Sequence, residues 1–168
     1  MKKNLEIKYK PGNLREIVFI TGLLKNYTHN TEKQTDIYYK TNRGRLKLRI
    51  INDSDGSLIL YSRAENKNKR ISKYTISKSR DFRELDFILR KQFKVLVTVI
   101  KKREIFIYKN IRVHIDKVKN LGRFLEIEII YDDLIKAKKQ MNELIDLLSL
   151  DENKLIKVSY SDLLINRR

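Results

Sequence analysis

The chain has 168 residues, of which 38 are Lys or Arg and 21 are Asp or Glu, so its formal net charge is +17. A field of this sign attracts polyanions: nucleic acid, an anionic membrane or nucleotide phosphates. The absence of Cys excludes disulfides and thiolate metal sites. No apolar run approaches the roughly 20 residues of a membrane-spanning helix, and the first residues lack the apolar core of a signal peptide. We expect a single domain over residues 1–168, in the cytoplasm and without a membrane partner.

The first half of the chain shows one helix among short strands. Residues 5–10 alternate apolar and charged side chains, as in a half-buried strand, and Pro11 with Gly12 ends the alternation. Helical spacing of apolar residues predicts a helix over residues 13–24, capped by Asn13. Turn residues bound four further predicted strands, at residues 35–40, 45–51, 57–64 and 70–78.

The second half adds three strands and two or three helices. Apolar residues on one face predict a helix over residues 81–93, capped by Ser79 or Asp81. Strands follow at residues 95–108, 111–118 and 123–131, and the short turns between them favour antiparallel pairing. A last long helix is predicted over residues 132–148, and a short helical turn near the end of the chain. The sequence thus predicts eight strands and three or four helices.

Several strands carry charge on one face and aliphatic side chains on the other. Arg45, Lys47 and Arg49 alternate with leucines and an isoleucine, and Glu126 and Glu128 do the same in a later strand. The charged faces could simply be solvated around an ordinary core. Alternatively the sheet closes into a barrel with the charges inside and the helices packed outside. Uncompensated charges inside would be costly, so the second arrangement makes physical sense with a polyanion and its metal as the filling.

A family resemblance favours the barrel. It covers nearly the whole chain and rests on LEIK (5–8), QTDIYY (34–39), GRLKLR (44–49), LILYSR (58–63), KKR (101–103), RVHIDKV (112–118), LGRFLEIE (121–128) and SYSDLL (159–164). In this order and spacing the sequence resembles the CYTH superfamily, also called triphosphate tunnel metalloenzymes. It is most similar to the class IV adenylyl cyclase-like branch, with thiamine triphosphatase relatives.

The resemblance implies an α+β fold, an eight-stranded closed antiparallel barrel that binds a triphosphate with Mg²⁺ or Mn²⁺. It implies metal ligands Glu6, Glu126 and Glu128, with Asp116 as an additional one, since hard divalent cations take oxygen ligands. Catalytic residues would be Glu6, Lys8, Glu126 and Glu128. Matching phosphate-binding positions are Lys8, Lys47, Arg49, Arg63, Lys101 and Arg103, with Arg112 a weaker match. The family's opening Glu-x-Glu-x-Lys reads Asn4-x-Glu6-x-Lys8 here, which puts a second metal position in doubt.

Three functions are compatible with these residues. The leading one is a metal-dependent triphosphatase acting on inorganic triphosphate or nucleoside triphosphates, because positioning and electrostatics provide most of phosphoryl-transfer catalysis. The alternative is a class IV adenylyl cyclase making cyclic AMP and pyrophosphate. The third is a non-catalytic binder of polyphosphate or RNA, although no aromatic RNA-binding motif supports a nucleic-acid partner. Cyclase-like relatives suggest a homodimer. His114 is assigned no chemistry, and Tyr160 and Asp162 are expected to be structural.

Overall fold

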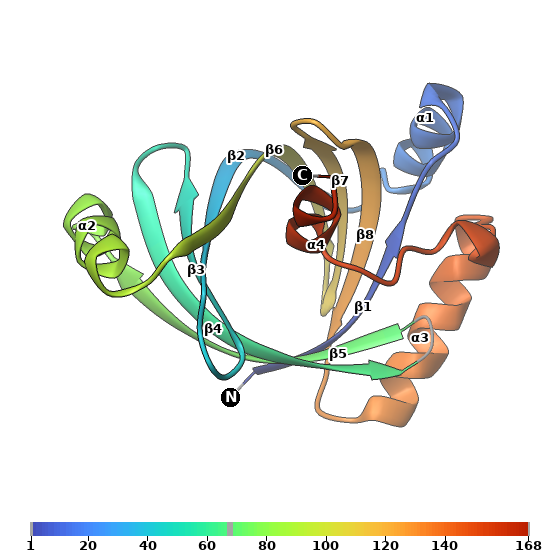
Figure 1. The fold of residues 1–168 in the computed structure, drawn as a ribbon. Helices are drawn as coiled ribbons and strands as arrows, with labels where there is room; N and C mark the ends of the chain where they lie inside the picture. Colours follow the sequence, from blue (N-terminus) through green and yellow to red (C-terminus); the bar gives the residue numbers. More distant parts are fainter. Residues whose placement is uncertain (1, 67–68, 168) are drawn as a thin grey trace.

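The computed structural model describes residues 2–66 and 69–167, without the side chains of residue 2 and of residues 63–66, 69 and 70. Eight antiparallel strands form a closed barrel in the order β1-β5-β4-β3-β2-β6-β7-β8, in which β8 pairs back with β1 (Figure 1). The strands are β1 (Lys2–Tyr9), β2 (Thr28–Tyr39), β3 (Arg45–Ile51), β4 (Asp55–Asn66), β5 (Lys69–Ser79), β6 (Val95–Tyr108), β7 (Ile111–Val118) and β8 (Gly122–Ile130). The predicted closed barrel is confirmed.

The helices cover the apolar outside of the barrel, with one exception. They are α1 (Leu14–Leu23), α2 (Phe82–Gln92), α3 (Leu134–Leu147), the 3-10 turn η1 (Glu152–Lys154) and α4 (Tyr160–Ile165). α4 lies at one mouth of the barrel, where Tyr160 packs among lumen residues (Figure 1). In the described part of the chain, no helix combines the length and the apolar character needed to cross a membrane.

Two outer cores hold the helices to the barrel. In the larger, Met141 and Ile145 of α3 and Ile20 of α1 pack against the outward faces of β1, β7 and β8. In the smaller, Leu89 of α2 packs against Ile37 of β2 and neighbouring residues of β3. Because successive strand residues point to opposite faces, burying these aliphatic side chains outside turns their charged neighbours into the lumen. The apolar outer faces therefore position the site.

Local signals account for the helix ends. The Asn13 side chain accepts a hydrogen bond from the Glu16 backbone at 3.0 Å, which confirms the predicted cap of α1. Asp81 occupies the N-cap position of α2, as predicted, but its side chain makes no capping hydrogen bond. In α4, Ser159 and Asp162 form a reciprocal capping box. The short α4 therefore has a defined start.

β2 departs most from the sequence-based expectation. It begins at Thr28, seven residues before the predicted start at residue 35. The added segment has no apolar residue, so no alternation marks it as a strand. Its partner supplies the order instead, because Thr28–Gln34 pairs residue by residue with Lys101–Ile107 of β6. Tertiary pairing here overrides a weak local signal.

Candidate active site

A cavity of about 150 Å³ occupies the barrel lumen. The described charged residues that line it are Glu6, Lys8, Asp36, Lys47, Arg49, Lys101, Arg103, Arg112, Glu126 and Glu128. Nine of these ten were predicted as site residues, and Asp36 was not. Of the remaining predicted residues, Asp116 is completely buried beside Arg103, and Arg63 belongs to β4 but its side chain lies outside the described residues.

The register of the strands places oppositely charged residues in facing positions in the lumen. Arg49 lies opposite Asp36, Arg103 opposite Asp116, Lys8 opposite Glu126, and Arg112 opposite Glu128. Opposite charges in directly facing positions stabilise neighbouring strands. The same alternation that points these side chains inward therefore also places four of the six lumen bases opposite an acid.

The first cluster centres on Asp36 of β2. Its carboxylate accepts two hydrogen bonds from the Arg49 guanidinium, at 2.7 and 2.8 Å, and one from Lys47 at 2.9 Å. Lys101 Nζ lies 3.9 Å from the same carboxylate. Asp36 is 1% exposed, so these contacts replace its hydration. One carboxylate thus holds three cations against one wall of the lumen.

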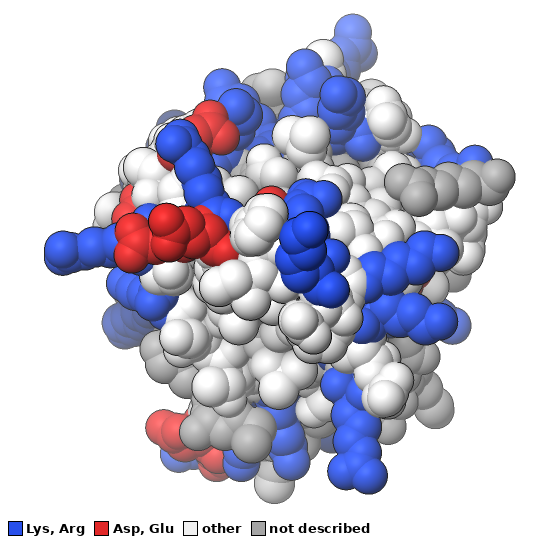
Figure 2. All heavy atoms as spheres, turned by 60° about the vertical axis from the view of Figure 1, so that its left-hand side comes forward, with Lys and Arg blue, Asp and Glu red and all other residues white. Residues whose placement is uncertain are grey.

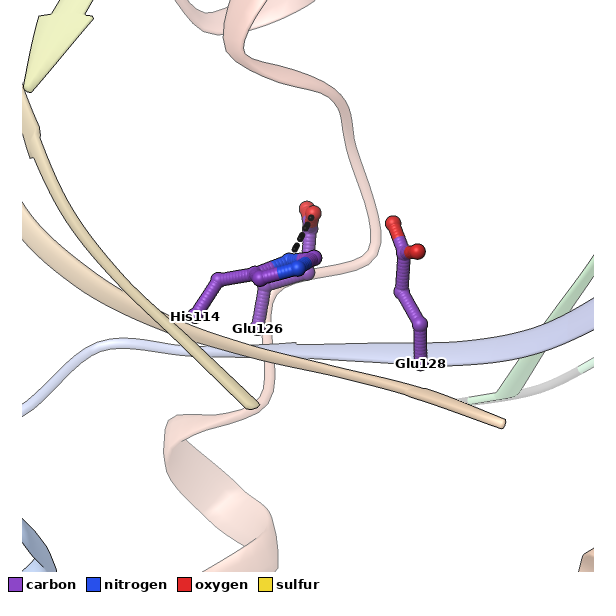
Figure 3. A group of neighbouring side chains, drawn as sticks. All are labelled: His114, Glu126 and Glu128. Atoms are coloured by element: carbon purple, nitrogen blue, oxygen red, sulfur yellow. Dashed lines mark ion pairs between the residues drawn. The ribbon is translucent and has the colours of Figure 1, made fainter. Parts of the chain in front are cut away.

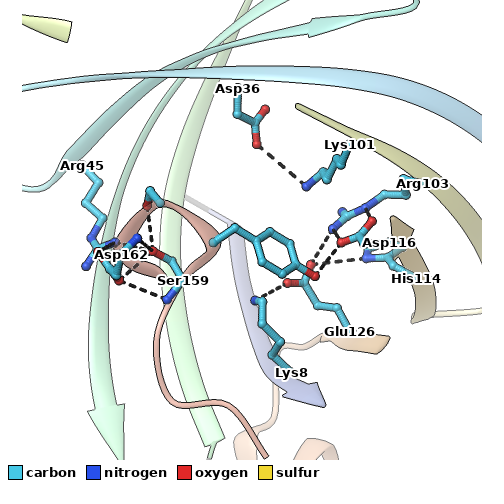
Figure 4. Close-up of polar contacts among 12 residues, drawn as sticks. Lys8, Asp36, Arg45, Lys101, Arg103, His114, Asp116, Glu126, Ser159 and Asp162 are labelled. Carbon is cyan, nitrogen blue, oxygen red and sulfur yellow. Dashed lines mark hydrogen bonds and ion pairs between the residues drawn. The ribbon is translucent and has the colours of Figure 1, made fainter. Parts of the chain in front are cut away.

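The second cluster centres on Arg103 of β6 (Figure 4). Its guanidinium donates to both oxygens of Asp116, each at 2.6 Å, and to Glu126 at 2.9 Å. Lys8 donates to the other Glu126 oxygen at 2.7 Å. The Tyr160 hydroxyl of α4 donates to Asp116 at 2.7 Å, so the last helix is tied into the lumen network.

The cations set the protonation of these carboxylates. Burial alone raises the pKa of Asp36, but the charges of Arg49 and Lys47 outweigh burial and hold this pKa well below its usual range. For Glu126, burial likewise raises the pKa, and Lys8 with Arg103 lowers it well below the usual value. Both carboxylates are therefore ionised at neutral pH.

Lys101 differs from these carboxylates, because its surroundings favour the neutral form of the side chain. Burial, together with the nearby charge of Arg103, lowers its pKa to about 7. The amine lies 5.3 Å from the centre of the Tyr160 ring, and among the described residues its only ion pair is the 3.9 Å contact with Asp36. The charge of Lys101 is thus only weakly compensated.

An acidic group lies at the β1–β7–β8 side of the lumen (Figure 3). His114, Glu126 and Glu128 each offer a ligand atom, and these atoms lie within 4.8 Å of one another. Glu6 faces Glu128 in register across β1 and β8. The structure therefore brings the predicted metal ligands Glu126 and Glu128 together with His114, places Glu6 opposite Glu128 in register, and places Asp116 with Arg103 instead.

Two buried polar atoms near this group have no hydrogen-bond partner among the described residues, Asn4 Oδ1 and His114 Nδ1. His114 Nδ1 lies 3.5 Å from a Glu126 oxygen, beyond an ordinary hydrogen bond. Buried polar atoms are usually satisfied. The carboxylates, the amide oxygen and the imidazole nitrogen form a donor set that suits a divalent cation.

The opposite wall of the cavity is less polar. Ile59 and Tyr61 of β4 and Tyr74 and Ile76 of β5 line it, and Ile76 is 47% exposed. The lumen therefore has a charged side built from β1, β2, β3, β6, β7 and β8, and the described side chains of β4 and β5 give it a less polar side.

The charged lumen is more nearly neutral than its sequence pattern suggests. Ten charged residues line it, six bases and four acids, and the buried Asp116 brings the count of acids to five. Sequence reasoning expected charges that only a polyanion could compensate. The register instead provides facing carboxylate partners for four of the six bases, which compensate much of their charge.

Sequence reasoning did not identify the lumen contacts of three residues. Asp36 was not considered, although it alternates with the outward Ile37 and so carried a detectable signal. His114 was assigned no chemistry, yet it is buried beside Glu126. Tyr160 was expected to be structural, and its contact with Asp116 crosses 44 residues of sequence that no local pattern could connect.

Lys, Arg and carboxylate side chains thus converge in the lumen of a closed antiparallel barrel. Residues 2–160 match the CYTH domain family, and the chain belongs to that family. Among curated protein sequences, none matches this chain.

Solved structures share the fold. The PH1012 protein of Pyrococcus horikoshii OT3 superposes with a TM-score of 0.83 at 24% identity, covering 97% of this chain and 99% of that one. A Vibrio parahaemolyticus protein, named as a candidate adenylate cyclase, gives 0.75 at 19% identity over 96% and 97% of the two chains. HpAC1 from Hippeastrum, described as having a dominant triphosphatase activity, gives 0.70 at 12% identity over 99% and 95%. At these identities the likeness concerns the fold.

Proposed function

We propose that this protein is a metal-dependent triphosphatase that hydrolyses inorganic triphosphate or nucleoside triphosphates inside the barrel. One observation carries the proposal: Lys8, Lys47, Arg49, Lys101 and Arg103 converge on a single cavity from three strands, and all but Arg49 are buried. Burying so many cations is costly, and a chain of phosphates is a ligand that gains most from them.

The two arginines and the lysines have different roles in this proposal. The planar guanidinium groups of Arg49 and Arg103 can each bind two phosphate oxygens, as they now bind two carboxylate oxygens. Lys8 and Lys47 act as point charges that neutralise the leaving phosphate. Because all these side chains project from strands of a closed sheet, they are held in place before the substrate enters.

Glu6, Glu126 and Glu128, with His114, are the residues that would hold Mg²⁺ or Mn²⁺. Such an ion supplies charge neutralisation of phosphate oxygens and lowers the pKa of bound water. Glu126 now bonds Lys8 and Arg103. When phosphates take over these two cations, the Glu126 oxygens become available, so we expect triphosphate and metal to strengthen each other's binding.

A product-resolved assay tests the proposal. Inorganic triphosphate and ATP are incubated separately with Mg²⁺ or Mn²⁺, and with EDTA as a control. Release of orthophosphate in the metal reactions supports the triphosphatase. No metal-dependent product from either compound contradicts it and leaves thiamine triphosphate or non-catalytic binding as the remaining functions.

The Glu128→Gln variant tests the acidic group directly. It keeps side-chain volume and removes a charge, so we expect turnover to fall by at least about 100-fold while tripolyphosphate binding survives. The exposed Glu143→Gln on α3 is the matched control and should leave both unchanged. Normal turnover in Glu128→Gln would refute the metal role of this residue.

The less polar wall favours a second candidate. Ile59, Tyr61, Tyr74 and Ile76 could accept the nucleoside part of ATP beside the phosphate-binding residues, as a class IV adenylyl cyclase requires. Cyclic AMP with pyrophosphate as products would establish this activity. The homodimer expected from the resemblance is a separate proposal, which sedimentation velocity tests.

A further inference from the structure

Basic side chains are spread over much of the surface, as the face in Figure 2 shows, with acidic ones at a few places between them. One group on the outside of the barrel differs from this dispersed pattern by its register. Lys33 of β2 faces Lys102 of β6, Lys102 faces Lys117 of β7, and Lys117 faces Arg123 of β8. All four are exposed. They form an unbroken row across four neighbouring strands, which we call the outer basic row.

The outer basic row borders a surface hollow of about 510 Å³. The described bases that line this hollow are Lys33, Lys101, Lys102, Lys117, Lys119 and Arg123, and its described lining contains no Asp or Glu. Lys33 pairs with Asp53 at 2.8 Å. Among the described residues, no carboxylate forms an ion pair with Lys102, Lys117 or Arg123. Glu104, two residues further along β6, lines a second hollow with these three bases and pairs with His29.

Such a row costs stability when it is empty. Like charges in directly facing strand positions repel one another, whereas in the lumen of the same barrel four bases face an acid across strands. Strands lie about 4.8 Å apart, so four strands span roughly 14 Å. This length corresponds to about four nucleotides of a stacked strand at roughly 3.4 Å each.

The surroundings favour a phosphate backbone over a membrane. The two apolar residues of the hollow, Ile100 and Val118, are half-buried and buried, so none projects to insert among acyl chains. The described lining also has no aromatic residue on which a base could stack. Recognition here would therefore depend on backbone charge and not on base identity.

We propose that the outer basic row binds the sugar–phosphate backbone of a single-stranded nucleic acid without sequence preference, at a site separate from the tunnel. Each lysine acts as a point charge on one phosphate, and Arg123 adds a forked contact. Neutralising about four phosphates of a single strand gives a salt dependence with a slope near −2.8 in log K against log[salt], at about −0.7 per phosphate.

Fluorescence anisotropy with a labelled 20-nucleotide RNA tests this, and a 5′-hydroxyl end avoids any triphosphate that could enter the tunnel. In the variant Lys102→Gln/Lys117→Gln/Arg123→Gln we expect binding at about 0.1 M salt to weaken by at least 10-fold. The salt slope should become shallower by about 2, because three phosphate contacts are lost. Tripolyphosphate binding and turnover in the tunnel should not change, so this proposal and the proposed function can fail separately.

A control variant removes the same charge elsewhere, at the exposed Lys25, Lys136 and Lys138. It should keep nearly the full RNA affinity. Equal weakening by the two variants would overturn the proposal in favour of diffuse attraction by the +17 charge. Binding of anionic phosphatidylserine vesicles or long polyphosphate without RNA binding would overturn it as well. Urea unfolding at low salt is an independent test. Lys102→Gln/Lys117→Gln/Arg123→Gln should unfold at a higher urea concentration than the native chain, because the repulsion between facing bases is removed. An unchanged midpoint would argue against such repulsion.

Discussion

Replacing Asp36 with Asn removes the only carboxylate that the described residues give to Arg49 and Lys47 while keeping the side-chain shape. Asp36 is 1% exposed, so water does not replace its charge. Breaking a buried ion pair by removing one partner costs about 3–5 kcal/mol, because the other charge stays buried and unpaired. We expect Asp36→Asn to lower the free energy of unfolding by this amount.

Urea unfolding with and without tripolyphosphate measures both the loss and its rescue. Phosphates can supply the missing negative charge, so the variant should gain more from tripolyphosphate than the native chain does. A ligand at about 100 times its Kd stabilises by about 2.7 kcal/mol, and the variant should also bind tripolyphosphate more tightly, since no carboxylate competes for Arg49.

The matched control is Asp53→Asn, which makes the same chemical change at an exposed ion pair. Lys33 and Asp53 have side chains 60% and 66% exposed, so the expected loss is below about 1 kcal/mol. Equal losses in the two variants, or a tripolyphosphate effect no larger in Asp36→Asn than in the native chain, would refute the assignment of Asp36 as the counter-charge of a phosphate site.

Three further predictions concern pH and the last helix. The pKa of Lys101 falls from 10.5 to about 7 on folding, so the unfolded chain holds more protons between these values; stability should rise with pH across this window, and Lys101→Met should flatten the rise in urea midpoints. Tyr160→Phe removes the hydrogen bond to Asp116 and should lower the free energy of unfolding by about 1–2 kcal/mol, measured by thermal unfolding. An unchanged Tm would show that this hydrogen bond does not stabilise the fold. Arg45 forms a partly exposed ion pair with Asp162, so Arg45→Gln should lower the free energy of unfolding by less than about 1 kcal/mol. The same change should accelerate hydrogen exchange in α4. Unchanged exchange there would mean that this ion pair does not hold the helix in place.

Sequence patterns predicted the strands wherever one face is aliphatic. The predicted bounds of β3, β6 and β7 match the structure. β3 and β7 alternate apolar and charged residues, and β6 begins with a run rich in Val and Ile, which favour strands. The early part of β2 was missed because residues 28–34 contain no apolar side chain. Its strand conformation comes from β6, a partner about 70 residues away in sequence, and single-segment patterns carry no information about such pairing.

The site was predictable to the extent that it follows the two-residue period. That period and the family resemblance pointed to the bases and acids that line the cavity, and the structure places nine of them there. The sequence could not show that Asp116 would accept hydrogen bonds from Arg103 and Tyr160. These contacts depend on how three distant segments meet. Partner choice among buried charges is a property of register and not of composition.

Closure of the barrel also constrains how the chain can fold. β1 pairs with β5 and with β8. Its pairing with β8 can form only after the chain has been synthesised to about residue 130. Until then one edge of β1 has unpaired backbone groups, which in many proteins invites pairing with another chain. β1 carries Lys3, Glu6 and Lys8 along its length, and charged side chains on an open edge discourage such pairing. Glu6 and Lys8, proposed to bind metal and phosphate in the finished tunnel, would thus also help to keep the growing chain from aggregating.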